Sequence, residues 1–220
     1  MWCVPSIDAE YKERLYDLVD IYNAPYDEKL PVVCLDEKSV ELRSDKRPSQ
    51  RCATTAALKR DSEYLRHGTA NIFVMSEPKG GLHYARVTKR RTRKDFAECV
   101  RWLAARYPDA ITIHLVMDNL NTHSEKSLIK RYGPEEGRRI WARFTPHYTP
   151  KHASWLNQAE ISIGVMSRCC LGKDRISDIK TLKARIAPFW KRRRQERWKI
   201  NWGFTRKRAA QWIKTFGSEH

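Results

Sequence analysis

The chain has 220 residues, and its 43 lysines and arginines against 26 aspartates and glutamates give a net charge of +17. This length allows one substantial domain with its own core, and the clustered positive charge points to a polyanionic partner, most simply nucleic acid. No apolar run approaches the roughly 18 residues of a membrane span, and the N-terminus lacks the layout of a signal peptide. We therefore expect a cytoplasmic, nucleoid-associated protein with no membrane partner.

The six cysteines form no CxxC pair and have no regular spacing. This usage fits a reducing compartment, and it argues against both a disulfide framework and a cysteine-based zinc site. Cys34 and Cys99 lie in apolar patterns and are expected to be buried.

The chain is expected to begin with a helical lead-in over residues 1–30. Ser6 is placed as the N-cap of a helix over residues 6–23. The apolar side chains of that helix recur on one face: Tyr11, Leu15, Leu18, Val19 and Tyr22. The segment is too small to hold a helix-turn-helix pair with its own core.

The apolar run Val32–Leu35 predicts a central strand that is covered on both faces and ends at Asp36. An acid at the carboxyl end of such a strand lies at the rim of the sheet, where ligands of open α/β sheets usually bind. The polar stretch from Glu41 to Gly68 has no clear period. We expect it to be a long loop between the first and second strands, with a function or with mobility.

The remaining elements follow from apolar periodicity and turn signals. In order, they are a hairpin of strands at 70–76 and 83–88, a helix capped by Thr92 and Asp95 and stopped by Pro108, a strand at 111–117 closed by Asp118, helices at 124–132 and 134–143, a strand at 143–148, a helix that carries Glu160, a long helix at 176–198 and a short helix around Trp212. Pro188 is expected to kink the long helix, because proline removes an amide donor.

Three carboxylates stand out in this arrangement: Asp36, Asp118 and Glu160. Clustered carboxylates repel one another and lose hydration, so they need protons or cations to coexist. Oxygen-only ligands favour magnesium or manganese. Each acid also has a simpler explanation: Asp118 as a helix cap, Asp36 as a partner of Lys38, and Glu160 as a lightly buried residue in a salt bridge.

Five segments, in this order, closely resemble the catalytic domain of DDE transposases of bacterial insertion sequences related to mariner elements: VVCLDEKS, HGTANIF, VTKRRTRKDFA, LVMDNLNTHS and HYTPKHASWLNQAEI. The resemblance covers nearly the whole chain. It implies an α/β protein with an RNase H-like fold, in which a mixed five-stranded sheet is flanked by helices. The strand, strand, strand, helix, strand order given by periodicity agrees with that fold.

By motif, the resemblance makes Asp36, Asp118 and Glu160 the catalytic, metal-binding triad, which holds two Mg²⁺ (or Mn²⁺) ions. It also implies cut-and-paste transposition, with double-stranded DNA of the transposon ends and the target as partner and a homodimer in the active complex. In the family a helical region that reads the element's ends precedes the catalytic domain. We expect that region to be absent here, leaving the lead-in, the catalytic domain at 31–200 and a helical tail at 201–220.

Other residues are expected to support the triad or to contact DNA. Asn119, Asn121, His123 and Asn157 are placed to hydrogen-bond a carboxylate or metal-bound water. For His123 a purely structural hydrogen bond is the alternative, and for Trp155 it is core packing. The expected DNA contacts are Lys89, Arg90, Arg91, Arg93, Lys94, Lys151, His152, Trp155, Arg192, Arg193 and Arg194.

The leading hypothesis from the sequence is therefore a transposase catalytic domain that cleaves DNA and transfers strands at insertion-sequence ends. Two alternatives share the same triad. One is a catalytically idle DNA-binding remnant of a transposase, and the other is an RNase H-like nuclease or resolvase without transposition.

Overall fold

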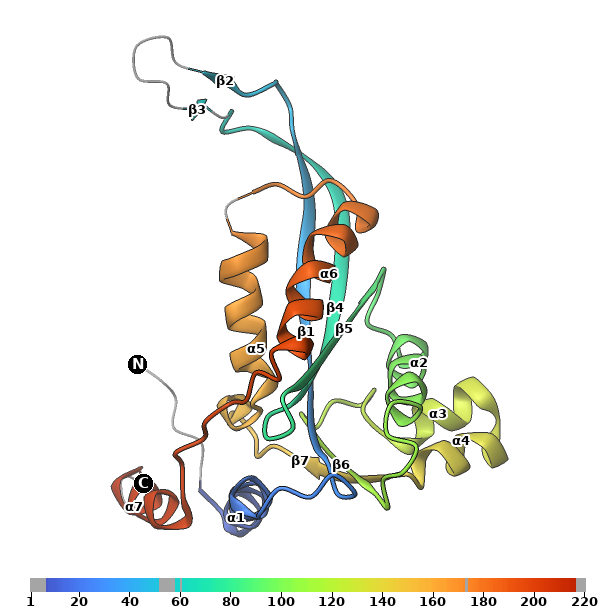
Figure 1. Ribbon diagram of the computed structural model, residues 1–220, viewed down its shortest axis with the longest axis vertical. Coiled ribbons are helices and arrows are strands. Elements are labelled where there is room, and N and C mark those ends of the chain that lie inside the picture. Colours follow the sequence, from blue (N-terminus) through green and yellow to red (C-terminus); the bar gives the residue numbers. More distant parts are fainter. Residues whose placement is uncertain (1–6, 52–57, 60, 173, 217–220) are drawn as a thin grey trace.

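The computed structural model describes residues 7–51, 58–59, 61–172 and 174–216, and Figure 1 shows the arrangement of its elements. In chain order they are α1 (Ala9–Asn23), β1 (Val32–Asp45), β2 (Gln50–Arg51), β3 (Leu58–Lys59), β4 (Tyr64–Glu77), β5 (Leu82–Thr88), α2 (Arg93–Ala104), β6 (Ile113–Met117), α3 (Glu125–Tyr132), α4 (Pro134–Trp141), β7 (Phe144–Tyr148), the 3₁₀ turn η1 (Ser154–Leu156), α5 (Ala159–Met166), the π-helical turn η2 (Ser167–Leu171), α6 (Ile179–Gln195) and α7 (Arg206–Phe216).

A mixed five-stranded sheet forms the centre of the protein, in the order β5-β4-β1-β6-β7. β4 is antiparallel to both of its neighbours, whereas β1, β6 and β7 run parallel to one another. β6 and the first part of β1, which pairs with it, are mostly apolar and buried, as expected for strands that are covered on both faces. The predicted five-stranded mixed sheet is therefore confirmed.

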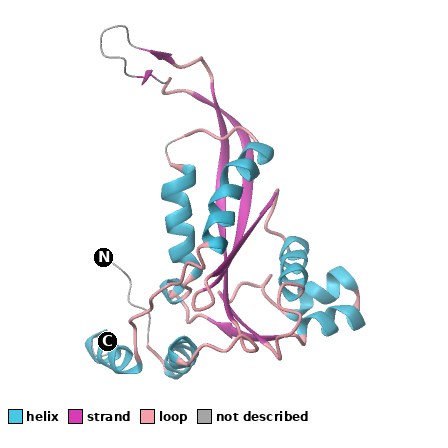
Figure 2. Cartoon of the chain, in the orientation of Figure 1, coloured by secondary structure: helices cyan, strands magenta, loops and turns pink. Residues whose placement is uncertain are grey.

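Helices cover both faces of this sheet (Figure 2). Alternate residues of β1 point to opposite faces: Val33 and Leu35 join the core under α2, α3 and α4, and Cys34 joins the core under α1. The second face is also covered by α5, η2 and α6, through Met166, Cys170, Leu182, Ile186 and Trp190. This alternation decides which face each polar residue of β1 can reach.

The N-terminal helix packs onto the sheet as its sequence predicts, because all five residues of its apolar face are buried. Its N-cap is Asp8, whose side chain accepts a hydrogen bond from the Tyr11 amide at 2.7 Å. The expected cap, Ser6, lies outside the described residues, and the helix starts later than predicted. α7 packs beside α1, where Trp212 stacks on Tyr11. The lead-in and the tail thus share one apolar cluster with the sheet.

The expectation of a long loop between the first two strands was wrong. β1 and β4 extend the sheet into a two-stranded arm that leaves the body, with the β2–β3 ladder near its far end (Figure 1). Polar cross-strand contacts hold the arm together, including Ser39 to Asn71 at 2.7 Å and Lys46 to Glu63 at 2.9 Å. Such pairs stabilise a ladder without any apolar period.

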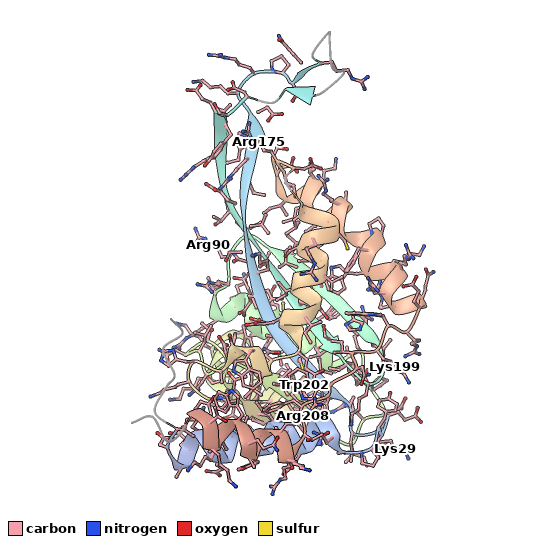
Figure 3. All side chains as sticks on the ribbon, turned by 90° about the vertical axis from the view of Figure 1, so that its left-hand side faces the viewer. Lys29, Arg90, Arg175, Lys199, Trp202 and Arg208 are labelled. Atoms are coloured by element: carbon pink, nitrogen blue, oxygen red, sulfur yellow. The ribbon has the colours of Figure 1, made fainter. Side chains whose placement is uncertain are left out.

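Arg175 ties the arm to the body. Its guanidinium donates to Asp45 Oδ1 and to the Asp61 and Glu63 carbonyls at 2.7–2.8 Å, and it lies over the Tyr64 ring. Figure 3 labels Arg175 against the two long strands. One side chain from before α6 therefore fixes both strands of the arm.

Several element boundaries differ from the predictions. Asp36 lies inside β1 and not at its end, because the strand continues into the arm. α2 ends at Ala104, before Pro108, and β6 begins at Ile113 because Ile111 is exposed. α6 continues through Pro188 as one helical element. Among the described residues, no helix is long and apolar enough to cross a membrane.

Candidate active site

The register of the parallel strands places Asp36 level with Asp118. The last pair of the β1–β6 ladder is Cys34 with Val116, so extending the register by two residues brings Asp36 next to Asp118, whose charge acts on Asp36. Neighbouring strands lie about 4.8 Å apart. β6 ends at Met117, so Asp118 opens a loop while Asp36 continues in β1 beside Val74 of β4. The sheet has a rim beside Asp36, as predicted. That rim is formed by the end of β6, whereas β1 continues past Asp36.

Glu160 enters the site from the first turn of α5. The buried Asn157 connects this turn to β1: its Nδ2 donates to the Leu35 carbonyl at 2.8 Å, and its Oδ1 accepts from the Ala159 amide at 3.1 Å. Its own carbonyl accepts from the Glu160 amide at 3.0 Å. Asn157 therefore links the residue before Asp36 to the residue before Glu160. The helix is buried as predicted at Ala159 and Met166, but Glu160 itself is exposed.

The three carboxylates interact electrostatically. Burial, helped by the charges of Glu37, Glu160 and Asp118, raises the pKa of Asp36 to about 7, although the Glu37 amide, which donates to Asp36 Oδ1 at 2.7 Å, opposes the rise. A carboxyl with such a pKa is partly protonated near neutrality. The site therefore holds more negative charge than its surroundings stabilise.

Asp118 is turned toward a buried histidine. Its Oδ1 lies 2.5 Å from Nδ1 of His123, which also faces the Asp118 carbonyl at 3.2 Å. On its other side, His123 Nε2 lies 2.9 Å from Oε1 of Glu37. Burial lowers the pKa of His123, but its contacts with Asp118 and Glu37 outweigh burial and raise it to about 9. His123 is therefore an imidazolium between two carboxylates at neutral pH.

The donor set fits a hard divalent cation. All three acids offer oxygen ligands, which Mg²⁺ and Mn²⁺ prefer. Oδ1 of Asp118 is buried against His123 without a hydrogen bond of good geometry, so the carboxylate is poorly satisfied by the protein alone, a cost that a cation on the same carboxylate would reduce. Among the residues that the structure describes, however, no group of three His, Cys, Asp or Glu side chains already has the geometry of a metal site. The side chains would have to rearrange on cation binding.

The four predicted supporting residues differ in burial. His123 and Asn157 are buried and bonded to the site as described above. Asn119 and Asn121 are exposed in the loop after Asp118.

The residues predicted to contact DNA fall into two groups. Lys89, Arg90 and Arg91 are exposed between β5 and α2, Arg93 and Lys94 are exposed in the first turn of α2, and Lys151 and His152 are exposed in the loop after β7. His152 has a positive φ of 59°, which is uncommon outside glycine and costs free energy. These seven side chains are accessible to a ligand.

The second group already has partners within the chain. Arg192 pairs with Glu196 at 2.6 Å, Arg193 lies over Phe189 and Trp198, and Arg194 donates to the His83 carbonyl at 3.1 Å. Trp155 is partly exposed and packs against Phe204 and Trp212. A DNA contact by these residues would require giving up some of these interactions.

Sequence reasoning missed Glu37 as part of the site. Its neighbour Asp36 was singled out because the apolar run appeared to stop there, so no face was assigned to the next residue. The alternation of a continuing strand places Glu37 on the face opposite to Asp36, where it meets His123.

The family described as DDE superfamily endonuclease matches residues 31–183. The chain belongs to this family. A search of curated proteins found no match. The family match spans the sheet, Asp36, Asp118 and Glu160, so the candidate site lies entirely within the DDE endonuclease domain.

Solved structures of the Mos1 mariner transposase have the same fold. The paired-end complex with Mn is 13% identical in sequence, with a TM-score of 0.58. The match covers 100% of this chain and 66% of the Mos1 chain. The paired-end complex with the left transposon end is 14% identical with a TM-score of 0.61, with 66% of it and 99% of this chain covered. The strand transfer complex is 13% identical with a TM-score of 0.60, with coverage of 61% and 95%. These matches confirm the RNase H-like fold of the DDE domain, and the chain spans just under two thirds of those transposases.

Proposed function

We propose that this DDE endonuclease domain is the catalytic part of a transposase, which cleaves double-stranded DNA at transposon ends and joins the freed ends to target DNA. The single observation that carries the proposal is the placement of Asp36 and Asp118 side by side, with Glu160 close enough to raise the pKa of Asp36. The Mos1 complexes with transposon ends and with Mn or Mg support the same reading for a protein of like fold.

In this proposal Asp36, Asp118 and Glu160 hold two divalent cations, Mg²⁺ or Mn²⁺. Bound there, such a pair supplies stabilisation of the attacking and leaving oxygens in phosphoryl transfer. Asn157 fixes the start of α5 against β1, so Glu160 is held in place relative to Asp36. The exposed cations at 89–94 and in the loop at 151–152 bind DNA phosphates and align the scissile bond. The protein contributes position and charge, and no covalent nucleophile.

Residues 31–200 form the catalytic unit in this proposal. The lead-in at 1–30 and the tail at 201–220 complete its apolar cluster through α1 and α7. The active complex is proposed to be a homodimer, so that two DNA ends are processed together.

A nicking and joining assay tests the proposal. Purified protein is incubated with DNA that bears the element's ends, in the presence of Mg²⁺ or Mn²⁺, and the products are resolved as nicked or joined strands. We expect Asp118→Asn to abolish both products and Asp109→Asn, a change of the same type at an exposed site, to have no effect. Cleavage that survives Asp118→Asn would refute the assigned role, and cut but never joined ends would indicate a nuclease.

A DNA-binding protein without catalysis is the second candidate, and one observation favours it. Asp118 is engaged by His123, and the described residues contain no preformed metal group. Such a protein would bind DNA with strong salt dependence and little sequence preference. Binding without cleavage at any concentration of Mg²⁺ or Mn²⁺, on the same DNA, would select this candidate.

A further inference from the structure

Glu37 is a buried acid that the triad does not use. Its side chain is 5% exposed, and it lies opposite Phe73 of β4, on the face of the sheet that α2 covers. Asp36 points to the other face, beside Val74. Two consecutive acids of one strand therefore serve opposite sides of the sheet. A buried carboxylate needs a charged partner or several hydrogen bonds, so its position requires an explanation.

The partner of Glu37 is His123, whose side chain is 1% exposed. The ring stacks on Phe96 with centroids 4.7 Å apart, and the His123 carbonyl accepts from the Tyr148 hydroxyl at 2.9 Å. These contacts fix the ring plane and the backbone of the residue. With the ring held in this plane, Nε2 points toward Oε1 of Glu37 at 2.9 Å, and Nδ1 points toward Oδ1 of Asp118 at 2.5 Å.

In this arrangement Glu37 fixes the position of the His123 ring, and the ring in turn fixes the position of the Asp118 carboxylate. Nε2 and Nδ1 of the buried ring each face one carboxylate oxygen, that of Glu37 and that of Asp118, so a displacement of the ring at Glu37 also displaces it at Asp118. The contact with His123 buries Oδ1 of Asp118, although the side chain as a whole is 38% exposed. The exposed part of the carboxylate is thus its other oxygen, Oδ2.

We propose that Glu37 is a positioning residue, which acts through His123 to hold the Asp118 carboxylate in the orientation that presents Oδ2 to a cation shared with Asp36 and Glu160. The inference rests on the proposed function, because it assigns the supporting group of a proposed cation ligand. Outer partners of ligating side chains typically change metal affinity or activity 10- to 100-fold when they are removed. Glu37 therefore belongs to the site although it touches neither cation nor DNA.

The test measures Mn²⁺ binding without DNA, by the loss of the free-ion electron paramagnetic resonance signal. Glu37→Gln keeps the size and the acceptor oxygen but removes the charge, and its matched control is Glu98→Gln, whose charge pairs with Arg131 on the surface. We expect Glu37→Gln to weaken Mn²⁺ binding by about tenfold, and Glu98→Gln to leave it unchanged. In DNA cleavage, kcat should fall for Glu37→Gln while KM for DNA stays constant.

A double-mutant cycle tests the route through His123. If Glu37 acts only by way of that ring, adding Glu37→Gln to His123→Gln produces no further loss of Mn²⁺ affinity. Additive losses, or a folded Glu37→Gln protein that binds Mn²⁺ like the wild type, would overturn the inference. The proposed function is judged separately: it fails if the wild type neither binds Mn²⁺ nor cleaves DNA, or if cleavage survives Asp118→Asn. The inference alone fails if the wild type binds Mn²⁺ and cleaves DNA and Glu37→Gln does both equally well.

Discussion

The ionised Asp36 carboxylate lowers the free energy of unfolding of the cation-free protein. Its pKa rises from 3.8 to about 7 on folding, through burial first and then through the neighbouring carboxylates. Between those two values the folded state binds more protons than the unfolded state, so this residue lowers stability as the pH rises from about 4 to about 7. The whole penalty is present above pH 7 and absent below pH 4.

Asp36→Asn should therefore stabilise the cation-free protein at high pH. A shift of about three units corresponds to ~4 kcal/mol, and we expect ~1–2 kcal/mol because water reaches part of the site. Thermal or urea unfolding in the presence of a chelator, at about pH 8 and about pH 4, measures the difference. The gain should vanish at the lower pH. A gain that is larger in acid would contradict the sign of the shift, and Asp109→Asn is the control for loss of one exposed carboxylate.

The three proposed ligands could be found from the sequence, because each acid lies in a distinctive sequence motif. Asp36 and Asp118 follow apolar runs, and Glu160 lies on a helix whose apolar residues recur at helical spacing. Glu37 could not be found in this way, since its role depends on the strand continuing past Asp36 and on a histidine 86 residues away in the chain. The roles of the basic residues were equally out of reach. Arg90 and Arg193 sit in similar runs, yet one is exposed and the other packs on Phe189 and Trp198.

The start of α5 depends on one buried amide. Asn157→Leu has nearly the same volume but leaves the Leu35 carbonyl and the Ala159 amide without their partners. Buried unpaired groups cost ~1–3 kcal/mol each, so we expect a loss of about 2–3 kcal/mol in the free energy of unfolding. Cleavage should fall further than stability explains, because Glu160 moves with the turn. Asn201→Leu, at an exposed position outside the site, should change neither urea midpoint nor kcat.

The arm provides a test of a different kind, because its strands have few apolar contacts. Arg175→Gln removes the charge that pairs with Asp45 and most of the donors to the Asp61 and Glu63 carbonyls. We expect faster amide hydrogen exchange in residues 43–45 and 61–64, with the central strands unchanged.

Arg47→Gln is the control for this change. Its side chain is 75% exposed and reaches Asp61 only at 3.7 Å, whereas that of Arg175 is 15% exposed. Equal effects of the two substitutions would show that the arm is held by general charge balance and not by Arg175.

These elements also show where periodicity succeeds and where it fails. α1 was predicted with its complete buried face, because its apolar residues follow a 3.6-residue period. The distal parts of β1 and β4 have polar residues on both faces, so no period exists to be found. Their pairing is decided by cross-strand contacts and by Arg175, which is 130 residues from Asp45 in the chain. Only the folded chain brings these groups together.

The helix-covered sheet and the distribution of exposed basic residues together indicate how DNA would approach the site. Helices cover both faces of the sheet, and Asp118 follows the end of β6, so we expect a duplex to approach the site at that end of the strand. The exposed cations at 89–94 lie between β5 and the first turn of α2 and within that turn, while other arginines, such as Arg192 and Arg193, already contact acids or aromatic rings of the chain. Net charge alone therefore overstates the number of groups available to phosphates.

The salt dependence of DNA binding separates available cations from occupied ones. Each phosphate neutralised contributes ~0.9 to the slope of log K against log salt. Replacing Lys89, Arg90 and Arg91 together by glutamine should reduce that slope by roughly 2–3 and weaken binding to all sequences alike. Binding is measured by fluorescence anisotropy in a chelator, so that cleavage does not interfere. The control replaces Lys130, Arg138 and Arg139, an equal loss of charge on α3 and α4, where Arg139 already pairs with Glu136 at 2.6 Å. If both triple variants lose the same slope, DNA responds to overall charge and the cations at 89–91 have no special place in the complex.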